Sequence, residues 1–381
     1  MGIATLQTAN PSAGTVSRMP QTTAAPAQSN VPFSRLSRHG QILGPNITGQ
    51  AYGSLWTPIL KPVGGYLRRL ILTIQSVPNA TPSTTSTIAA DAPYNVVQNL
   101  FFRDPFGQPI IQASGYSLLL ISLYSGQVGA LGIGNVPALM PSWVPASATT
   151  GAFTVVLPIP LELDSSGYCS LPDMNASSQP TIQVQLNPTS VVFTTLTGNA
   201  PSLTMAIDEP FWMAPVDNPQ AAPADVGSSS QWSETRAAAG IGSGQFQRIQ
   251  LPRVGTYIHT LILTLRDSTG ARIDAWPTSD LALWFDGVPQ LMETFTQRVD
   301  RMFTQFGVTR PTGVLVYSFR DSIQTFVSTG DTYDLLAPTT PATLLEVSGT
   351  FGTISNAPAT ITCTIGELFP LSGIPYAHLA Q

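Results

Sequence analysis

The chain contains an internal repeat that places two similar segments half a chain length apart. Residues 60–75 read Leu-Lys-Pro-Val-Gly-Gly-Tyr-Leu-Arg-Arg-Leu-Ile-Leu-Thr-Ile-Gln, and residues 251–266 read Leu-Pro-Arg-Val-Gly-Thr-Tyr-Ile-His-Thr-Leu-Ile-Leu-Thr-Leu-Arg. Eight of the sixteen positions are identical across an offset of 191 residues. Self-similarity at a fixed offset indicates a duplicated structural unit. The length of 381 residues suits two sandwich domains better than one.

Further short apolar segments follow in the same order in each half. Their residues are not identical, so these matches depend on order and spacing. The matched segments are 96–102 with 281–285, 151–159 with 313–319, 181–186 with 344–347, and 203–207 with 359–365. This order predicts that both halves share one topology.

The pattern of these segments is typical of β-sandwiches. Runs of β-branched and aromatic residues alternate with Pro, Gly and Asn turns. One helix is expected between Pro289 and Gly307, where apolar residues recur every three or four positions. Its counterpart is expected at 113–125. The sequence therefore predicts an all-β fold of two tandem jelly-roll β-sandwiches with short helical insertions.

Two stretches lack any periodicity and suggest domain boundaries. The first contains mostly Gly, Pro, Ser, Thr, Gln and Ala, and the second is rich in Pro and then in Gly and Ser. The predicted organisation is an extended N-terminal arm at 1–45, a first jelly roll at 46–215, a linker at 216–246, and a second jelly roll with a C-terminal tail at 247–381.

Charge is scarce and unevenly distributed. Charged residues make up only 10% of the chain, against roughly 25% in ordinary soluble proteins, which suits a surface that faces other protein copies. The net charge of −5 argues against a protein that coats DNA with its whole surface. No acidic residue precedes Asp91, although six basic residues do. This basic region is either a solvated arm and strand rim, or a contact for anionic phosphate.

Signals for secretion and membrane insertion are not evident. The first 30 residues lack the apolar core of a signal peptide. No apolar run approaches the ~18 residues that cross a bilayer. The two cysteines, Cys169 and Cys363, allow at most one disulfide bond.

A search for catalytic or metal-binding groups does not predict a site. The three histidines are far apart and have no partners at metal-ligand spacing. The acidic pairs Glu162/Asp164 and Asp208/Glu209 lie where strands meet turns, a usual place for solvated carboxylates. The glycine-rich stretch 240–244 is not followed by the Lys-Ser/Thr of a phosphate loop. We therefore expect no catalytic, metal or cofactor site and no enzyme activity.

Residues 92–116 resemble a segment of the major capsid proteins of tectiviruses, which are double-stranded DNA phages with an internal membrane. The segment reads Ala-Pro-Tyr-Asn-Val-Val-Gln-Asn-Leu-Phe-Phe-Arg-Asp-Pro-Phe-Gly-Gln-Pro-Ile-Ile-Gln-Ala-Ser-Gly-Tyr. The positions that carry the resemblance are Asn95, Val97, Gln98, Asp104, Pro105, Gln108, Ser114, Gly115 and Tyr116. The match covers about 25 residues. The almost lysine-free composition and the Pro-rich inserts depart from the family.

The resemblance implies a structural role in a virion. Two jelly rolls in each chain of a homotrimer would form a pseudo-hexagonal capsomer that tiles an icosahedral shell over an internal membrane. The implied partners are neighbouring capsomers, the penton protein, minor capsid or membrane proteins, and the lipid membrane; direct sequence-specific nucleic-acid binding is not implied. The implied location is the virion capsid, after assembly in the host cytoplasm. The arm would lie near the membrane, where Arg18, Arg35 and Arg38 would meet lipid phosphates.

Two other functions remain open from sequence. A two-domain jelly-roll protein that binds or cleaves glycans would have a cleft between its halves lined by tryptophan and carboxylate side chains. A viral spike or receptor-binding module would be trimeric but would carry a fibrous stalk repeat. The six tryptophans form no stripe in the sequence, and no stalk repeat is visible.

Overall fold

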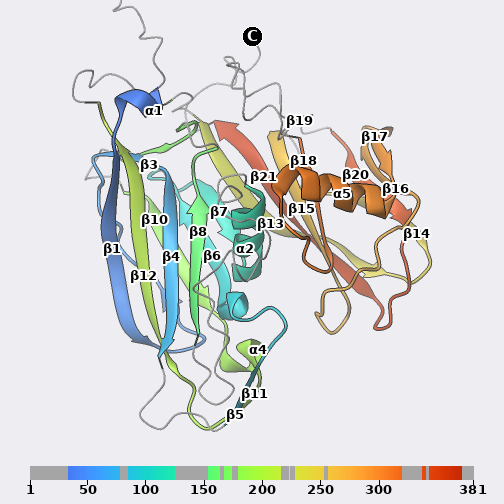
Figure 1. Ribbon diagram of the computed structural model, residues 1–381, viewed down its shortest axis with the longest axis horizontal. Coiled ribbons are helices and arrows are strands. Elements are labelled where there is room, and N and C mark those ends of the chain that lie inside the picture. Colours follow the sequence, from blue (N-terminus) through green and yellow to red (C-terminus); the bar gives the residue numbers. More distant parts are fainter. Residues whose placement is uncertain are drawn as a thin grey trace, which may run out of the picture. The chain divides into compact units, whose positions relative to one another are not determined.

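The computed structural model describes most of the chain and is dominated by β-strands (Figure 1). The described residues are 33–77, 85–125, 153–163, 167–173, 179–215, 223, 228–252, 256–319, 337–339 and 343–370. Residues from Phe33 onward belong to one compact unit. Among the described residues, no helix is long and apolar enough to cross a membrane.

The first half of the chain forms two facing sheets. One sheet has the order β1-β12-β4-β8, and the other has the order β2-β10-β6-β7. The bounds of these strands are β1 His39–Gln50, β2 Leu55–Trp56, β4 Arg69–Val77, β6 Val97–Arg103, β7 Pro109–Ala113, β8 Thr154–Pro160, β10 Thr181–Leu186 and β12 Ser202–Met213.

The second half repeats these pairings strand by strand. Its sheets have the orders β13-β21-β15-β18 and β14-β20-β16-β17. The bounds are β13 Ser228–Ile241, β14 Phe246–Gln250, β15 Tyr257–Arg266, β16 Leu281–Phe285, β17 Val288–Glu293, β18 Val314–Ser318, β20 Leu345–Thr350 and β21 Ala359–Pro370. Each half is therefore an eight-stranded jelly roll, and the segment matches expected from the sequence are confirmed.

The two repeat segments form equivalent strands of the two jelly rolls. In β4, Ile71 lies opposite Asp208 of β12, and in β15 the repeat-equivalent Ile262 lies opposite Thr364 of β21. Every second residue of β4 is buried, as expected for a strand whose sheet is covered on one face only. Strand β15 is buried at almost every position, which indicates that both of its faces are covered.

Shorter elements complete the two sandwiches. A small two-stranded sheet pairs β5 with β11, and β3 and β9 extend the first sheet beyond β12. The bounds are α1 Phe33–Leu36, β3 Gly65–Leu67, β5 Thr85–Ile88, η1 Tyr94–Val96, β9 Leu171–Asp173, α4 Thr189–Val192, β11 Phe193–Thr197 and β19 Ala337–Pro338.

In the described part of each jelly roll one helix is longer than four residues, and it lies directly after β7 in the first and after β17 in the second, as expected. Helix α2 spans Gly115–Tyr124 and α5 spans Phe295–Phe306. Thr294 and Gln297 form a capping box at the start of α5, and Gly307 ends it in the left-handed conformation. The helix begins later than Pro289 because residues 288–293 pair with β16 instead.

The boundaries of the arm and the linker are corrected by two strands. Strand β1 begins at His39, inside the predicted arm at 1–45, because it completes the edge of the first sheet. Strand β13 occupies 228–241 of the predicted linker at 216–246, where it pairs with β21 along its length. The predicted domain ranges otherwise stay predictions.

Candidate functional site: the junction between the two jelly rolls

The residues of the 92–116 motif build one hairpin and the start of one helix. Asp104 is buried in the turn between β6 and β7, where its Oδ1 accepts hydrogen bonds from the backbone N–H groups of Phe106 (2.9 Å) and Gln108 (2.7 Å). Pro105 suits the second position of this turn, and Gly107 takes a positive φ of 87°. The Asp-Pro pair therefore fixes where the strand reverses.

The Ser-Gly pair of the motif starts α2. The side chain of Ser114 accepts a hydrogen bond from the N–H of Ser117 and caps the helix. A Cβ at Gly115 would lie 1.9 Å from the backbone oxygen of Tyr94, so only glycine fits this close approach. Asn95, at the beginning of the motif, is also structural, because it donates to the backbone oxygen of Val191 at 2.8 Å.

Two motif residues of β6 differ in their surroundings. Val97 is buried in the core, and Gln98 is exposed and lines a groove at the junction. The motif positions thus come together around the β6–β7–α2 region, which faces the second jelly roll.

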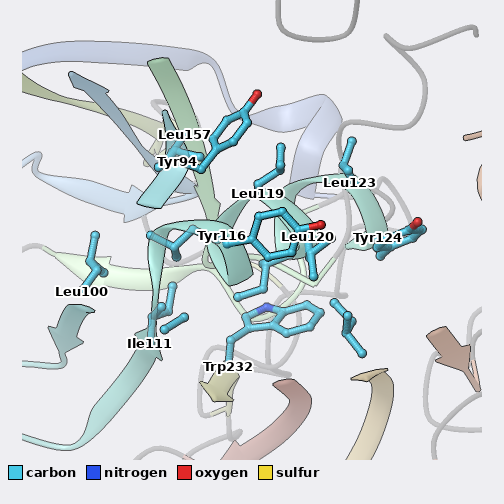
Figure 2. Close-up of a cluster of buried hydrophobic side chains, with 14 of the residues drawn as sticks. Tyr94, Leu100, Ile111, Tyr116, Leu119, Leu120, Leu123, Tyr124, Leu157 and Trp232 are labelled. Carbon is cyan, nitrogen blue, oxygen red and sulfur yellow. The ribbon is translucent and has the colours of Figure 1, made fainter. Parts of the chain in front are cut away.

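Helix α2 is buried on all sides, since each of its ten residues is buried. One side packs against β8 of its own jelly roll, where Ser122 donates to the backbone oxygen of Pro158 at 2.6 Å. The other side meets the second jelly roll: Figure 2 shows Trp232 of β13 next to Tyr116 and Leu120. Ser117 also contacts Thr364 of β21 through their hydroxyl groups, 3.2 Å apart. The helix is therefore a shared core element of both jelly rolls.

A parallel strand pair joins the two jelly rolls into one sheet. Trp232 and Ser233 of β13 pair with Ile111 and Gln112 of β7. The sheet consequently runs without interruption from β18 of the second jelly roll to β2 of the first. Next to this pair, the carboxylate of Glu234 accepts a hydrogen bond from the backbone N–H of Ser114 at 2.6 Å.

An ionic cluster, which we call the junction clamp, holds the two halves together at a second place. Asp91 of the first jelly roll binds Arg266 at 2.5 Å and Arg272 at 2.8 Å, both from the second. The two guanidinium groups also lie over the ring of Tyr116, 5.2 and 4.7 Å from its centre. Burial raises the pKa of Tyr116 to about 12, so the phenol stays neutral beside them. The clamp was not predicted, because its three charged residues are far apart in the sequence.

The arm arginines are described only in part. Arg35 lies in α1 and Arg38 just before β1, and both side chains are exposed. The backbone oxygen of Arg38 accepts from the N–H of Met213, which places it at the end of β12. Arg18 lies outside the described residues.

A buried polar cluster lies close to these arginines at the same end of β12. Arg68 donates to Glu162 at 2.8 Å, and Trp212 donates to the other oxygen of this carboxylate at 3.1 Å. His39 lies 2.6 Å from Arg68 through its Nδ1. Burial raises the pKa of Glu162, against the opposing effect of Arg68, and burial together with Arg68 lowers the pKa of His39. The cluster thus anchors the first residues of β1 to the sandwich.

The described members of the acidic pairs considered from the sequence have structural partners. Glu162 pairs with Arg68, whereas Asp164 lies outside the described residues. Asp208 accepts a hydrogen bond from Gln41 at 3.3 Å, whereas its neighbour Glu209 is fully buried beneath β1. Within the described ranges, no group of three or more His, Cys, Asp or Glu side chains is placed to hold a metal ion.

The groove at the junction also differs from a glycan-binding cleft. It has a volume of about 300 Å³ and is lined by Gln98, Asn99, Gln112, Ser114, Glu234, Thr235, Arg236 and Thr362. One carboxylate and no indole belong to this set. The ring of Trp232 is instead buried against α2 (Figure 2).

Several solved structures that are similar to this chain are viral proteins. PBCV-1 VP54, in a structure fitted into a cryo-EM reconstruction of the virophage Sputnik, aligns with a TM-score of 0.64 at 11% identity, over 89% of this chain and 95% of its own. The fold is a double jelly roll. The STIV MCP, from Sulfolobus turreted icosahedral virus, aligns with a TM-score of 0.62 at 13% identity, over 90% of this chain and 99% of its own.

A third structure is the major capsid protein P2 from bacteriophage PM2. It aligns with a TM-score of 0.52 at 12% identity, over 88% of this chain and 100% of its own. No protein-family model and no curated protein sequence matches this chain. At these identities the similarity concerns the fold, and it confirms the double jelly roll that the 92–116 resemblance implied.

The junction clamp leads to a first prediction. Asp91→Asn should lower the free energy of unfolding by roughly 2 kcal/mol, because two largely buried guanidinium groups lose their counter-ion. Chemical denaturation of this variant, of Arg272→Gln and of the double variant gives the coupling energy of the pair. Strictly additive effects of the two substitutions would contradict the clamp.

The buried carboxylate of Glu209 leads to a second prediction. Burial raises its pKa from 4.5 to about 7, although a hydrogen bond from the backbone N–H of Lys61 (3.4 Å) opposes the shift. Because the folded-state pKa lies above the unfolded value, the stabilisation is fully present below pH 4.5 and is lost as the pH rises through 7.

The stability of the wild-type chain should therefore fall between pH 5 and pH 8 by on the order of 1 kcal/mol more than that of Glu209→Gln. Denaturant titrations of both proteins at the two pH values measure this difference. Parallel pH profiles for the two proteins would show that Glu209 does not titrate in this range.

Proposed function

We propose that this chain is the major capsid protein of a virus, a structural protein and not an enzyme. The observation that carries the proposal is the union of two complete jelly rolls through one continuous sheet and a shared helix, in the arrangement found in viral major capsid proteins. The 92–116 motif, which resembles that of tectiviruses, lies at the centre of this union.

The duplication supports a trimeric quaternary arrangement. Three chains supply six similar sandwiches, and a ring of six sandwiches forms a pseudo-hexagonal capsomer that packs against six neighbours. Such capsomers would tile an icosahedral shell, with penton and minor proteins at the places that hexagons cannot fill. The scarcity of charged residues, 10% of the chain, suits a surface that is mostly covered by other copies.

The proposed location is the virion capsid, over an internal membrane, after assembly in the host cytoplasm. The basic N-terminal arm is the part that we assign to the membrane. Arg35 and Arg38 are exposed at one end of the first jelly roll, and Arg18 precedes them in the chain. Basic residues near an anionic lipid surface contribute about 1 kcal/mol each to binding.

A glycan-binding or glycan-cleaving function has no comparable support. The groove at the junction contains the carboxylate of Glu234, which is engaged by the backbone of Ser114. Four tryptophans are buried and offer no platform for a sugar ring, namely Trp56, Trp212, Trp232 and Trp276. The ring of Trp284 is covered by the guanidinium group of Arg248, 4.5 Å from its centre. Trp143 lies outside the described residues.

The quaternary arrangement can be tested on the purified chain. Light scattering coupled to size-exclusion chromatography should give the mass of three chains, and negative-stain images of the same peak should show a hexagonal outline. A stable monomer at all concentrations would contradict the capsomer.

The membrane assignment can be tested with vesicles. Replacing Arg18, Arg35 and Arg38 by alanine should weaken binding to vesicles rich in phosphatidylserine by about 3 kcal/mol, on the order of a hundredfold. Replacing the exposed arginines Arg103 and Arg236 of the sandwich strands is the control and should have little effect. Equal binding by the triple variant and the wild type would exclude the arm as the membrane contact.

A further inference from the structure

The junction within the chain shows how one jelly roll packs on the next. Strand β7 and helix α2 of the first jelly roll cover the β13 edge and one face of the β13-β21-β15 sheet of the second. Because the halves share one topology, the second jelly roll has its own copy of the covering side, β17 and α5. The first has its own copy of the covered side, β1, β12 and β4. We call the covering side, β17 and α5, the donor side, and we call the covered side, β1, β12 and β4, the acceptor side.

Residues of the acceptor side are partly exposed at positions whose equivalents in the second jelly roll are buried. Ile262 and Thr264 of β15 are buried, with exposed fractions of 0% and 4%. Their equivalents in β4 are the identical residue types Ile71 and Thr73, and both are only half-buried. The same side chains on the same strand therefore differ in burial because the second jelly roll has a neighbour within the chain and the first does not.

The edge of the acceptor side is also open and apolar. Strand β1 pairs with β12 along one edge. On β1, Leu43 is 72% exposed. An open strand edge with an exposed leucine is a template for pairing with another strand.

The donor side shows the same contrast. All residues of α2 are buried, whereas in α5 only Arg298 and Met302 are. Phe303 of α5 is 58% exposed and Met292 of β17 is 70% exposed. Large apolar side chains in these positions are typical of protein–protein contacts.

We propose that the donor side of one copy packs on the acceptor side of a second copy, in the register of the junction within the chain. This inference rests on the trimer of the proposed function and specifies its contacts. Strand β17 lies parallel to β1 of the next copy, and α5 lies over β12 and β4. Because the donor side and the acceptor side are different surfaces, each copy can bind one copy on each side, and three copies close into a ring.

The register follows from repeat-equivalent residues. The helix caps Ser114 and Thr294 match, so Ser117 corresponds to Gln297. Thr364 corresponds to Asp208, because each lies opposite the matched isoleucine of the central strand. The contact of Ser117 with Thr364 therefore becomes a contact of Gln297 with Asp208 of the next copy.

The strand pair maps in the same way. In the chain, Trp232 lies opposite Ile111. The pairings of β1 with β12 and of β13 with β21 make Trp232 equivalent to Gln41. Counting back from the matched helix caps makes Ile111 equivalent to Leu291. Gln41 of one copy consequently lies opposite Leu291 of another, next to the exposed Met292.

The contact between copies is expected to be weaker than the junction within the chain. The clamp residue Arg266 corresponds to Gln75 in the first jelly roll, so the acceptor side lacks one of the two arginines of the clamp. The exposed positions of α5 also include the polar residues Thr296, Gln297, Asp300 and Arg301. The trimer should therefore dissociate before the two jelly rolls of a chain separate.

A charge test addresses the contact of Gln297 with Asp208. Gln297→Glu keeps the capping box, since glutamate serves at this position as well as glutamine, but it places two carboxylates together between copies. The trimer dissociation constant should rise at least tenfold, and Asp208→Lys combined with Gln297→Glu should restore it. An unchanged constant for Gln297→Glu, or no recovery in the double variant, would overturn the proposed register.

A cross-linking test addresses the strand pair. With Gln41→Cys and Leu291→Cys in the same chain, a short bifunctional thiol reagent should give covalent trimers on a denaturing gel, because these two positions lie opposite each other on the same face of the strand pair. The native cysteines are both buried, and a control chain carries Gln41→Cys with Phe106→Cys, an exposed position in the β6–β7 turn. Covalent dimers without trimers would indicate a two-fold contact and would overturn the proposal, as would equal cross-linking of the control.

The two proposals can fail separately. If the wild-type chain is not a trimer in light scattering, the proposed capsomer fails. If it is a trimer that neither Gln297→Glu nor the cysteine pair affects, the capsomer stands and the proposed contact is wrong.

Discussion

The parallel pairing of β7 with β13 is the constraint on which the rest of the structure depends. It turns two jelly rolls into one sheet, and it fixes their relative position by backbone hydrogen bonds instead of by side chains alone. The position of α2 follows from it, because the helix that covers β8 also lies against Trp232 and Thr364. The clamp at Asp91 adds a second fixed point, so the two halves cannot hinge freely about the strand pair.

Much of this fold could be predicted from the sequence because the duplication is still visible in it. Four of the eight identical pairs, Leu70/Leu261 to Thr73/Thr264, lie in the central strands β4 and β15, whose burial restricts the choice of side chain. Helix α5 was predictable because one of its sides is exposed, which produces a periodic pattern. Helix α2 was predicted only as its counterpart, since a helix that is buried all round has no such pattern.

The parts that were missed depend on neighbours that the sequence does not reveal. Strand β13 reads as a linker because its Ser, Ala and Gly residues favour no strand by themselves, but its position between β21 and β7 requires an extended segment. Strand β1 was expected to begin later for the same reason, since Gly40, Gly44 and Pro45 suggest a loop. The resemblance at 92–116 marked the right region, but it did not indicate that these residues form the junction.

The complete burial of α2 has a consequence for how the protein is made. All strands of the first jelly roll precede residue 214, so this half can fold while the ribosome is still translating the second. One side of α2 then remains in water until β13 and β21 arrive, and β21 ends only at residue 370. During this interval the nascent chain presents Tyr116 and Leu120 to its surroundings, next to the open edge of β7. Exposed apolar surface beside an unpaired strand is prone to aggregate. At this surface the ribosome-bound intermediate is therefore more prone to aggregate than the finished chain.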